Sequence, residues 1–190
     1  MIETKNITKK YGADTVLENI SLSFPDRSKN VIMGDSGRGK TTLLRIIAGL
    51  EPPDSGTVSC PLRIAYMFQE PRLLPWKNAI DNVKAFLPRK KYDLADKYIN
   101  AVGLSNSAKK RISELSGGMA QRVAFARFLA YAEANNAELL LLDEPFSALD
   151  VSTAKHMIDL LVSVSDNKTV ILVTHDTSQA EIIGDTTVYL

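Results

Sequence analysis

Eight consecutive residues have the types and spacing of a phosphate-binding loop. They match the pattern G-x-x-x-x-G-K-[ST] and run Gly34-Asp35-Ser36-Gly37-Arg38-Gly39-Lys40-Thr41, with Thr42 next. Glycines let backbone N–H groups curl around an anion. The Lys40 ammonium can reach the β- and γ-phosphates of a nucleotide, the Thr41 hydroxyl can ligate Mg²⁺, and Thr42 can contact the α-phosphate.

The flanking residues decide between this interpretation and a glycine-rich turn. An apolar run at Asn30–Met33 precedes the loop, and a helical pattern follows from Lys40. A strand before the loop and a helix after it are the setting in which this motif binds phosphate, because the helix N-terminus adds partial positive charge. A dinucleotide-binding loop is excluded, since the glycines here run G-x-x-G-x-G.

Two carboxylates follow a run of four leucines later in the chain. Leu139–Leu142 is typical of a buried parallel strand, and Asp143 and Glu144 stand at its carboxyl end. Ligands bind at that end of parallel sheets, so Asp143 is a candidate to hold Mg²⁺ and Glu144 to polarise an attacking water. The structural alternative is an acidic turn or helix cap, which the nearby phosphate-loop motif disfavours.

His175 follows another apolar run, 169–174, and is therefore expected at the same sheet edge. A neutral imidazole there can hydrogen-bond a γ-phosphate oxygen and orient a water. A lone histidine in that place is otherwise a helix cap or a partly exposed residue. His156, the other histidine, falls within a helical pattern, and we assign it a structural role.

These candidates need a scaffold that brings several strand ends to one edge. Continuous apolar runs between helical patterns predict a mainly parallel sheet covered on both faces. Alternating apolar and polar residues over Val16–Phe24 predict an antiparallel hairpin near the N-terminus. The helix after the phosphate loop is predicted over Lys40–Leu50, with Leu50 on its apolar face. The fold class is therefore α/β.

The middle of the chain changes character and suggests an inserted helical subdomain. Prolines at 71, 75 and 88 divide it into short pieces, and helical patterns cover Asn78–Leu87, Tyr92–Val102 and Gly118–Ala134. We expect a single domain over residues 1–190, with a core at about 1–69 and 135–190. The helical subdomain is expected at about 70–134.

The composition is that of an ordinary globular protein and excludes several classes. Lys and Arg total 23 against 22 Asp and Glu, which leaves no overall basic surplus for general nucleic-acid binding. The single cysteine, Cys60, excludes an intramolecular disulfide and a multi-cysteine zinc site. Apolar runs fall short of the ~18 to 20 residues of a membrane span. The single cysteine also fits a reducing compartment, and the polar residues soon after Met1 predict that there is no secretory signal.

Further motifs complete a recognisable set. In chain order they are Leu115-Ser116-Gly117-Gly118-Met119 with Gln121-Arg122, then Asp143-Glu144-Pro145, Ser147-Ala148-Leu149-Asp150 and Thr174-His175-Asp176. Together with the phosphate loop they closely resemble the nucleotide-binding subunit of ATP-binding cassette (ABC) transporters, over essentially the whole chain. The resemblance implies a P-loop NTPase core that binds ATP and Mg²⁺ and hydrolyses ATP.

The resemblance also assigns roles to residues that would otherwise pass as structural. Ser116–Gly118 alone would be a capped helix start, but in the family this segment is a second anion cradle facing the phosphate loop of another subunit. Tyr11 matches the aromatic residue that stacks on adenine; packing at the hairpin end is the structural alternative. Gln69 matches the glutamine that contacts Mg²⁺ or the attacking water. Asp150 matches the aspartate that crosses the dimer interface.

The partners follow from the same resemblance. It implies a transmembrane permease, a second nucleotide-binding subunit bound head to tail in the presence of ATP, and indirectly a solute-binding protein, but no nucleic acid. The expected location is cytoplasmic, on the inner face of the cell membrane through the permease.

The segment Gln69–Trp76 resembles importers of the nitrate, sulfonate and taurine type. An exporter or a lipoprotein-release ATPase is the alternative. An ABC ATPase acting on nucleic acid or the ribosome is disfavoured, because no tandem cassette or coiled-coil insertion is present. A catalytically inactive binding module is disfavoured by the intact Lys40, Asp143, Glu144 and His175. Nothing in the sequence identifies the transported solute.

Three apolar residues in the proline-rich linker, Leu73, Leu74 and Trp76, have two interpretations. They pack into the core, or they are exposed and form a hydrophobic groove for a permease helix. Pro71 and Pro75 stiffen the linker, so a shift at Gln69 could move the helical subdomain as a body.

Overall fold

The computed structural model describes residues 1–190. Its strands are β1 (Ile2–Tyr11), β2 (Asp14–Phe24), β3 (Lys29–Met33), β4 (Ser55–Ser59), β5 (Ile64–Met67), β6 (Leu139–Asp143), β7 (Thr169–Val173) and β8 (Thr186–Tyr189). Its α-helices are α1 (Lys40–Ile47), α2 (Ala79–Lys84), α3 (Asp93–Ala101), α4 (Gly117–Ala134), α5 (Val151–Val164) and α6 (Thr177–Ile183). Short 3₁₀ turns lie at Arg89–Lys91, Ser105–Ser107 and Ile112–Glu114. None of the helices combines the length and the apolar character that crossing a bilayer requires.

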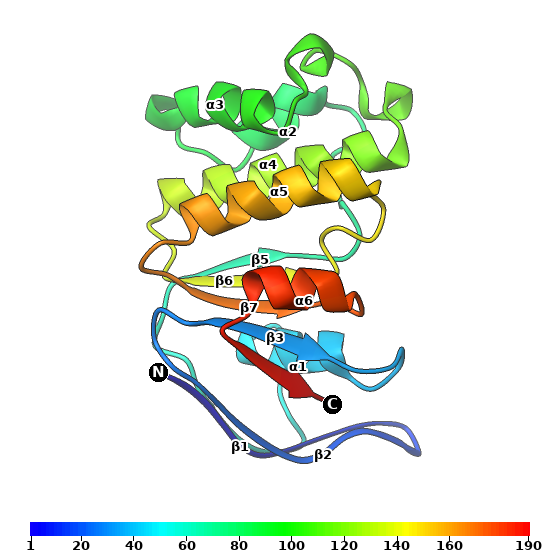
Figure 1. Ribbon diagram of the computed structural model, residues 1–190, viewed down its shortest axis with the longest axis vertical. Coiled ribbons are helices and arrows are strands. Elements are labelled where there is room, and N and C mark those ends of the chain that lie inside the picture. The colour runs from blue at the N-terminus through cyan, green and yellow to red at the C-terminus, as the bar shows by residue number, and fades with distance from the viewer.

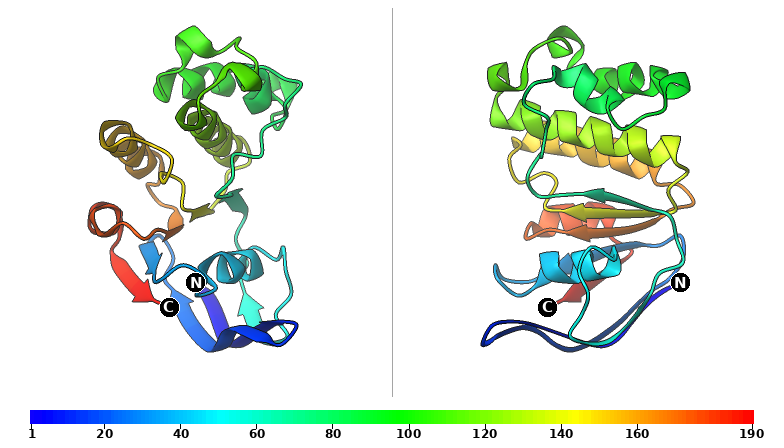
Figure 2. Two further views of the ribbon diagram at one scale, coloured as in Figure 1. Left: turned by 90° about the vertical axis from the view of Figure 1, so that its right-hand side faces the viewer. Right: turned by 180° about the vertical axis from the view of Figure 1, so that it is seen from behind.

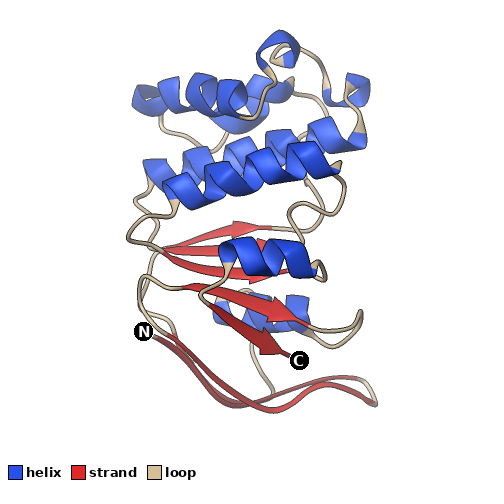
Figure 3. Cartoon of the chain, viewed as in Figure 1, coloured by secondary structure: helices blue, strands red, loops and turns tan.

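A five-stranded parallel sheet forms the centre of the molecule, in the order β5-β6-β7-β3-β8 (Figures 1 and 3). Every residue of β6 and β7 is buried. Successive side chains of a strand face opposite ways, so Leu140 and Leu142 join the core on one face while Leu139 and Leu141 join the core on the other. The predicted α/β class and the mainly parallel sheet are therefore confirmed.

The second sheet is antiparallel and lies beyond α1, which packs between the two sheets (Figure 1). Its order is β2-β1-β4, and both β2 and β4 run antiparallel to β1. This confirms the predicted N-terminal hairpin. The apolar side chains of the hairpin that point inward, such as Ile7, Leu17 and Phe24, pack with α1 against the parallel sheet.

The opposite face of the parallel sheet is covered by α4, α5 and α6, with α2 and α3 in a further layer above α4 (Figure 2). One hydrophobic cluster of 34 buried residues continues from this outer layer through α4 to the sheet. The helices between residues 70 and 134 therefore share a core with the sheet. Their status as a distinct subdomain with those boundaries remains our proposal.

Helix α1 is shorter than predicted, and the prediction for Leu50 was wrong. The helix ends at Ile47, and Gly49 takes a left-handed backbone with φ of 69°. The Gly49 N–H donates to the Ile46 carbonyl (3.0 Å) and the Leu50 N–H to the Arg45 carbonyl (2.9 Å). This is the Schellman arrangement that closes helices at glycine. It turns the Leu50 side chain outward, and 58% of Leu50 is exposed.

Replacing Leu43 and Leu50 by alanine tests this boundary. Leu43 is fully buried between the sheets, so Leu43→Ala should lower the free energy of unfolding by about 2 to 5 kcal/mol. Leu50→Ala, the matched control, should change it by less than about 0.5 kcal/mol. Urea denaturation followed by circular dichroism measures both. Equal losses would mean that the helix continues through Leu50.

Candidate functional site

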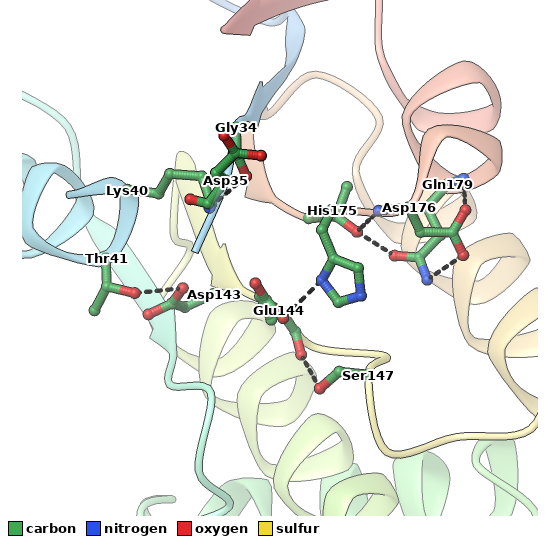
Figure 4. A network of polar contacts seen from close by, with 11 residues as sticks. Gly34, Asp35, Lys40, Thr41, Asp143, Glu144, Ser147, His175, Asp176 and Gln179 are labelled. Carbon is green, nitrogen blue, oxygen red and sulfur yellow. Dashed lines mark hydrogen bonds and ion pairs between the residues drawn. The ribbon is translucent and has the colours of Figure 1, made fainter. Parts of the chain in front are cut away.

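The three neighbouring strands β6, β7 and β3 run in the same direction, so their carboxyl ends meet at one edge of the sheet. The phosphate loop follows β3, Asp143 ends β6, and His175 comes two residues after β7. Figure 4 shows these side chains gathered around one space. The sheet thus brings together Lys40, Thr41, Asp143, Glu144 and His175, as the sequence predicts.

The phosphate loop lies directly against β2, and glycine is required for that approach. Gly34, Gly37 and Gly39 all have positive φ, of 145°, 83° and 83°. A Cβ added at Gly39 would lie 2.8 Å from the Val16 carbonyl oxygen and 2.7 Å from Leu17 Cδ2. No side chain fits that space, so the backbone curvature that directs N–H groups inward depends on the glycines.

Lys40 is held inside this curve. Only 6% of the residue is exposed, and its Nζ donates to the carbonyl oxygens of Gly34 and Asp35, both at 2.7 Å. An ammonium has three donors, so one remains available for a phosphate oxygen. The side chains of Asp35, Ser36 and Arg38 point outward and are exposed. The loop therefore offers backbone and Lys40 to a ligand.

Thr41 and Asp143 form the second part of the site. The Thr41 hydroxyl donates to Asp143 Oδ1 at 3.0 Å. Asp143 is 2% exposed, and this burial raises the pKa of its carboxyl, while the Thr41 hydrogen bond opposes the rise. A hydroxyl and a carboxylate side by side are the oxygen donors that Mg²⁺ takes from proteins, with phosphates and waters completing its shell. The donor set fits that ion.

Glu144 has an unusual backbone. Its φ is 45°, a left-handed conformation that costs a side-chain-bearing residue energy. The Glu144 N–H donates to the Val173 carbonyl (3.0 Å), and the Ser147 hydroxyl donates to the Glu144 carbonyl (3.1 Å). These bonds hold the strained turn, which directs the carboxylate differently from that of Asp143. His175 Nδ1 lies 3.1 Å from Glu144 Oε2.

The residues on either side of His175 are hydrogen-bonded to the first turn of α6. Asp176 caps α6 by accepting from the N–H groups of Ser178 (2.8 Å) and Gln179 (3.4 Å). The Thr174 hydroxyl donates to Gln179 Oε1 at 2.8 Å. Our sequence reasoning missed Gln179. The signal was present, because Asp176 and Gln179 have the three-residue spacing of a capping box.

The segment Ser116–Gly118 begins α4 as expected. Ser116 is the N-cap, and its Oγ accepts from the Met119 N–H at 3.3 Å. A buried contact connects this helix to the carboxyl edge of the sheet, because Gln121 Nε2 donates to the Pro145 carbonyl at 2.9 Å. Gln121 was noted in the sequence only as part of a motif. No local pattern could have shown that it reaches the turn after Glu144.

The remaining candidates lie around the rim. Tyr11 is 46% exposed, and its hydroxyl bonds the Glu51 carboxylate, which raises the pKa of Tyr11. Gln69 is exposed just beyond β5. Asp150 caps α5, accepting from the Thr153 N–H at 3.0 Å, and its hydrogen bonds hold the pKa of this carboxyl far below its usual range. In the single chain, the Asp150 carboxylate is therefore already hydrogen-bonded to the first turn of α5.

Known proteins are similar to this chain in sequence and in fold. The family profile described as ABC transporter matches residues 17–147. The aliphatic sulfonates import ATP-binding protein SsuB 2 of Frankia alni is 41% identical, over 100% of this chain and 76% of that protein. The aliphatic sulfonates import ATP-binding protein SsuB of Escherichia coli (strain K12) is 44% identical, over 94% of this chain and 72% of that protein.

A solved structure agrees in both fold and chemistry. The ATP-binding cassette MJ0796, determined as a dimer in a post-hydrolysis state with ADP and Pi, superposes with a TM-score of 0.90 at 32% identity. The match covers 100% of this chain and 94% of that one. The phosphate loop, the paired carboxylates and His175 at one sheet edge are thus set in the fold of an ATPase cassette, and this chain belongs to the ABC transporter family as one of its ATP-hydrolysing members.

Proposed function

We propose that this chain hydrolyses ATP to power a membrane permease that imports a small organic sulfonate. The observation that carries the ATPase part is the meeting of Lys40, Thr41, Asp143, Glu144 and His175 at the carboxyl edge of β3, β6 and β7. The import part rests on the relatives, whose names describe sulfonate import. Nothing in the ATPase site itself selects the solute.

The roles of the site residues follow from their positions. The loop amides and Lys40 bind the phosphates, and Thr41 and Asp143 hold Mg²⁺, which neutralises charge on the phosphate oxygens when bound. Glu144 accepts a proton from the attacking water. The His175 imidazole orients the Glu144 carboxylate, and Gln69, which follows β5 at the same edge of the sheet, is proposed to contact Mg²⁺ or the attacking water.

Two copies of the chain complete the site. Ser116 and the N-terminus of α4 form an anion cradle that lies on a different part of the chain from the phosphate loop. We infer that this cradle serves the ATP bound to a second copy, as a head-to-tail dimer requires. Tyr11 then stacks on the adenine, and the Asp150 turn lies at the dimer interface. MJ0796, which is similar over the whole chain, forms dimers.

A groove beside Gln69 is the proposed docking place of the permease. It is a cavity of about 340 Å³, and its lining includes five aromatic residues: Tyr66, Phe68, Phe86, Phe128 and Tyr131. The Tyr66 hydroxyl in its wall is buried without a hydrogen-bond partner. An amphipathic helix could bury its apolar face here. Such docking would place the subunit on the cytoplasmic face of the membrane. A solute-binding protein would then affect this subunit only indirectly, through the permease.

Arg127 connects α4 to the chain segment just after Gln69, which lines this groove. It projects from α4 and donates to the carbonyl oxygens of Pro71 (2.6 Å) and Arg72 (2.9 Å), just after Gln69. Its guanidinium also lies over Phe86, 5.3 Å from the ring centroid. The segment that follows Gln69 therefore forms one wall of the groove and is fixed to α4. We infer that a shift of Gln69 towards the γ-phosphate reshapes the groove.

The sequence left open whether Leu73, Leu74 and Trp76 belong to the core or to a groove. Leu73 packs against the main core. The Leu74 backbone is bound on both sides by Asn82, whose Oδ1 accepts from the Leu74 N–H (2.7 Å) and whose Nδ2 donates to the Leu74 carbonyl (3.2 Å). Trp76 is 76% exposed and lies outside the groove lining. Leu73, Leu74 and Trp76 therefore do not line the groove, whose aromatic lining comes from other residues.

Lys40→Ala should weaken ATP binding. The variant loses a charge-assisted contact worth about 1.5 to 3 kcal/mol, which corresponds to roughly 10- to 150-fold in Kd. Isothermal calorimetry with Mg²⁺ present measures the change. Lys90→Ala removes an exposed lysine in the 3₁₀ turn Arg89–Lys91, away from the site, and should bind as the unaltered chain does. Equal affinity in all three proteins would contradict the role given to Lys40.

Glu144→Gln should retain ATP binding and lose turnover by roughly 10²- to 10⁴-fold, because an amide cannot accept the proton of water. It should also accumulate an ATP-bound dimer, since opening requires hydrolysis. Steady-state phosphate release and size-exclusion chromatography with ATP give the two readings. Glu138→Gln makes the same change at an exposed residue directly before β6 and should leave ATP turnover unchanged. Normal turnover in the Glu144 variant would exclude it as the base.

Phe86→Glu should abolish association with the permease while ATP binding by the isolated subunit stays intact. Phe86 is 49% exposed, so the charge does not disturb the core but would be buried beneath a docked helix. Co-purification with the permease subunit, in detergent, measures the effect. Leu50→Glu places a charge on another exposed apolar residue and should still co-purify. Retained association of the Phe86 variant would place the docking surface elsewhere.

A further inference from the structure

The charges of this chain are segregated along the sequence. Residues 70–134 contain 12 Lys and Arg against 6 Asp and Glu, while residues 135–190 contain 2 against 9. The two parts lie on different sides of the molecule. In the left panel of Figure 2, α5 and α6 stand at the left, with α2 and α3 above and to the right. A nearly neutral protein is thus strongly polarised.

Four of the cations gather at one place, which we call the basic edge: Lys77, Lys109, Lys110 and Arg111. An antiparallel bridge joins Asn78 to Arg111, and the Ala79 N–H donates to the Lys110 carbonyl at 3.0 Å. This pairing brings Lys77 beside the run 109–111, although more than thirty residues separate them. The three residues of that run are exposed.

No cation of the basic edge has an ionic partner. The chain's ion pairs involve other lysines and arginines, such as Lys97 with Glu133. Glu114 is close in sequence, but its carboxylate accepts from the Arg111 backbone N–H at 2.6 Å and caps the following turn. Three exposed cations and the half-buried Lys77, none of them in an ion pair, therefore lie together at the surface.

Trp76 adjoins the basic edge and is the only tryptophan of the chain. It is 76% exposed and lies outside the groove proposed for the permease. An indole left in water is unfavourable, whereas at the boundary between headgroups and hydrocarbon it is favoured. An exposed tryptophan beside unpaired lysines is the combination that membrane surfaces bind.

We propose that the basic edge and Trp76 contact the anionic lipid headgroups of the membrane that holds the permease. The inference rests on the proposed function, since the groove for the permease begins at the chain segment just before Trp76. The cations spread along an exposed surface, which suits a layer of headgroups better than a single phosphate ion. The acidic part, residues 135–190, is repelled by the same layer, so the charge separation also orients the subunit.

Vesicle binding by the isolated, full-length chain tests this inference without any permease. The expected result is binding to vesicles containing phosphatidylglycerol, no binding to pure phosphatidylcholine, and loss of binding in 1 M salt, where the Debye length falls to about 3 Å. The emission of Trp76 should shift to shorter wavelength on binding. Because Trp76 is the sole tryptophan, this signal comes from the proposed contact itself.

Lys109→Gln/Lys110→Gln should weaken vesicle binding by about 25-fold, at about fivefold for each surface cation. Its ATP turnover should be unchanged, which also shows that it folds. The matched control, Lys5→Gln/Lys155→Gln, makes the same charge change at exposed positions elsewhere and should bind vesicles normally.

Three results would overturn the proposal: no preference for anionic vesicles, equal losses in the two double variants, or tighter binding to a mixed-sequence oligonucleotide than to the vesicles. The last would make the basic edge a nucleic-acid surface. Capture of the permease in detergent is measured separately, so failure of the lipid contact leaves the proposed function untouched, and failure of permease capture leaves the vesicle result untouched.

Discussion

The parallel alignment of β6, β7 and β3 is the constraint on which the rest of the structure depends. These strands are buried on both faces, and their register fixes where each chain segment leaves the sheet. The phosphate loop, the carboxylates and the histidine are therefore positioned by backbone hydrogen bonds several residues away from the chemistry. Displacing any one strand by two residues would carry its functional group about 6 to 7 Å out of the site.

The backbone is strained at Glu144, where the alignment of the strands alone would not direct the side chain into the site. Glu144 would continue the line of β6 if its backbone were extended, and its carboxylate would then point to the opposite side from Asp143 and into the core. The left-handed φ of 45° turns the chain at this residue, and the bonds from Val173 and Ser147 stabilise the turn. Gly34 and Gly39 also have positive φ, and at both positions a side chain would collide with the neighbouring backbone, so only glycine fits.

Sequence reasoning found the elements and the site residues wherever the signal was local. The strand, loop and helix around Lys40 lie within nineteen consecutive residues, Lys29–Ile47, so composition and spacing sufficed. It failed at Leu50, where apolar periodicity outweighed the helix-closing Gly49. It also missed the bonds of Gln121 to Pro145 and of Arg127 to the segment after Gln69. Their partners are 24 and 56 residues away, and only the folded chain brings them together.

Helix α4 carries three contacts on one continuous piece: Ser116 at its start, Gln121 in its second turn, and Arg127 farther along. Eleven residues of helix span about 16 Å, and a helix is stiff over that length. A partner that contacts the helix near Arg127 and a ligand that binds at Ser116 therefore act on the same rigid helix. By thermodynamic linkage, an occupant of the groove that favours one position of this helix changes the affinity for nucleotide by the same factor by which nucleotide changes the affinity for the occupant.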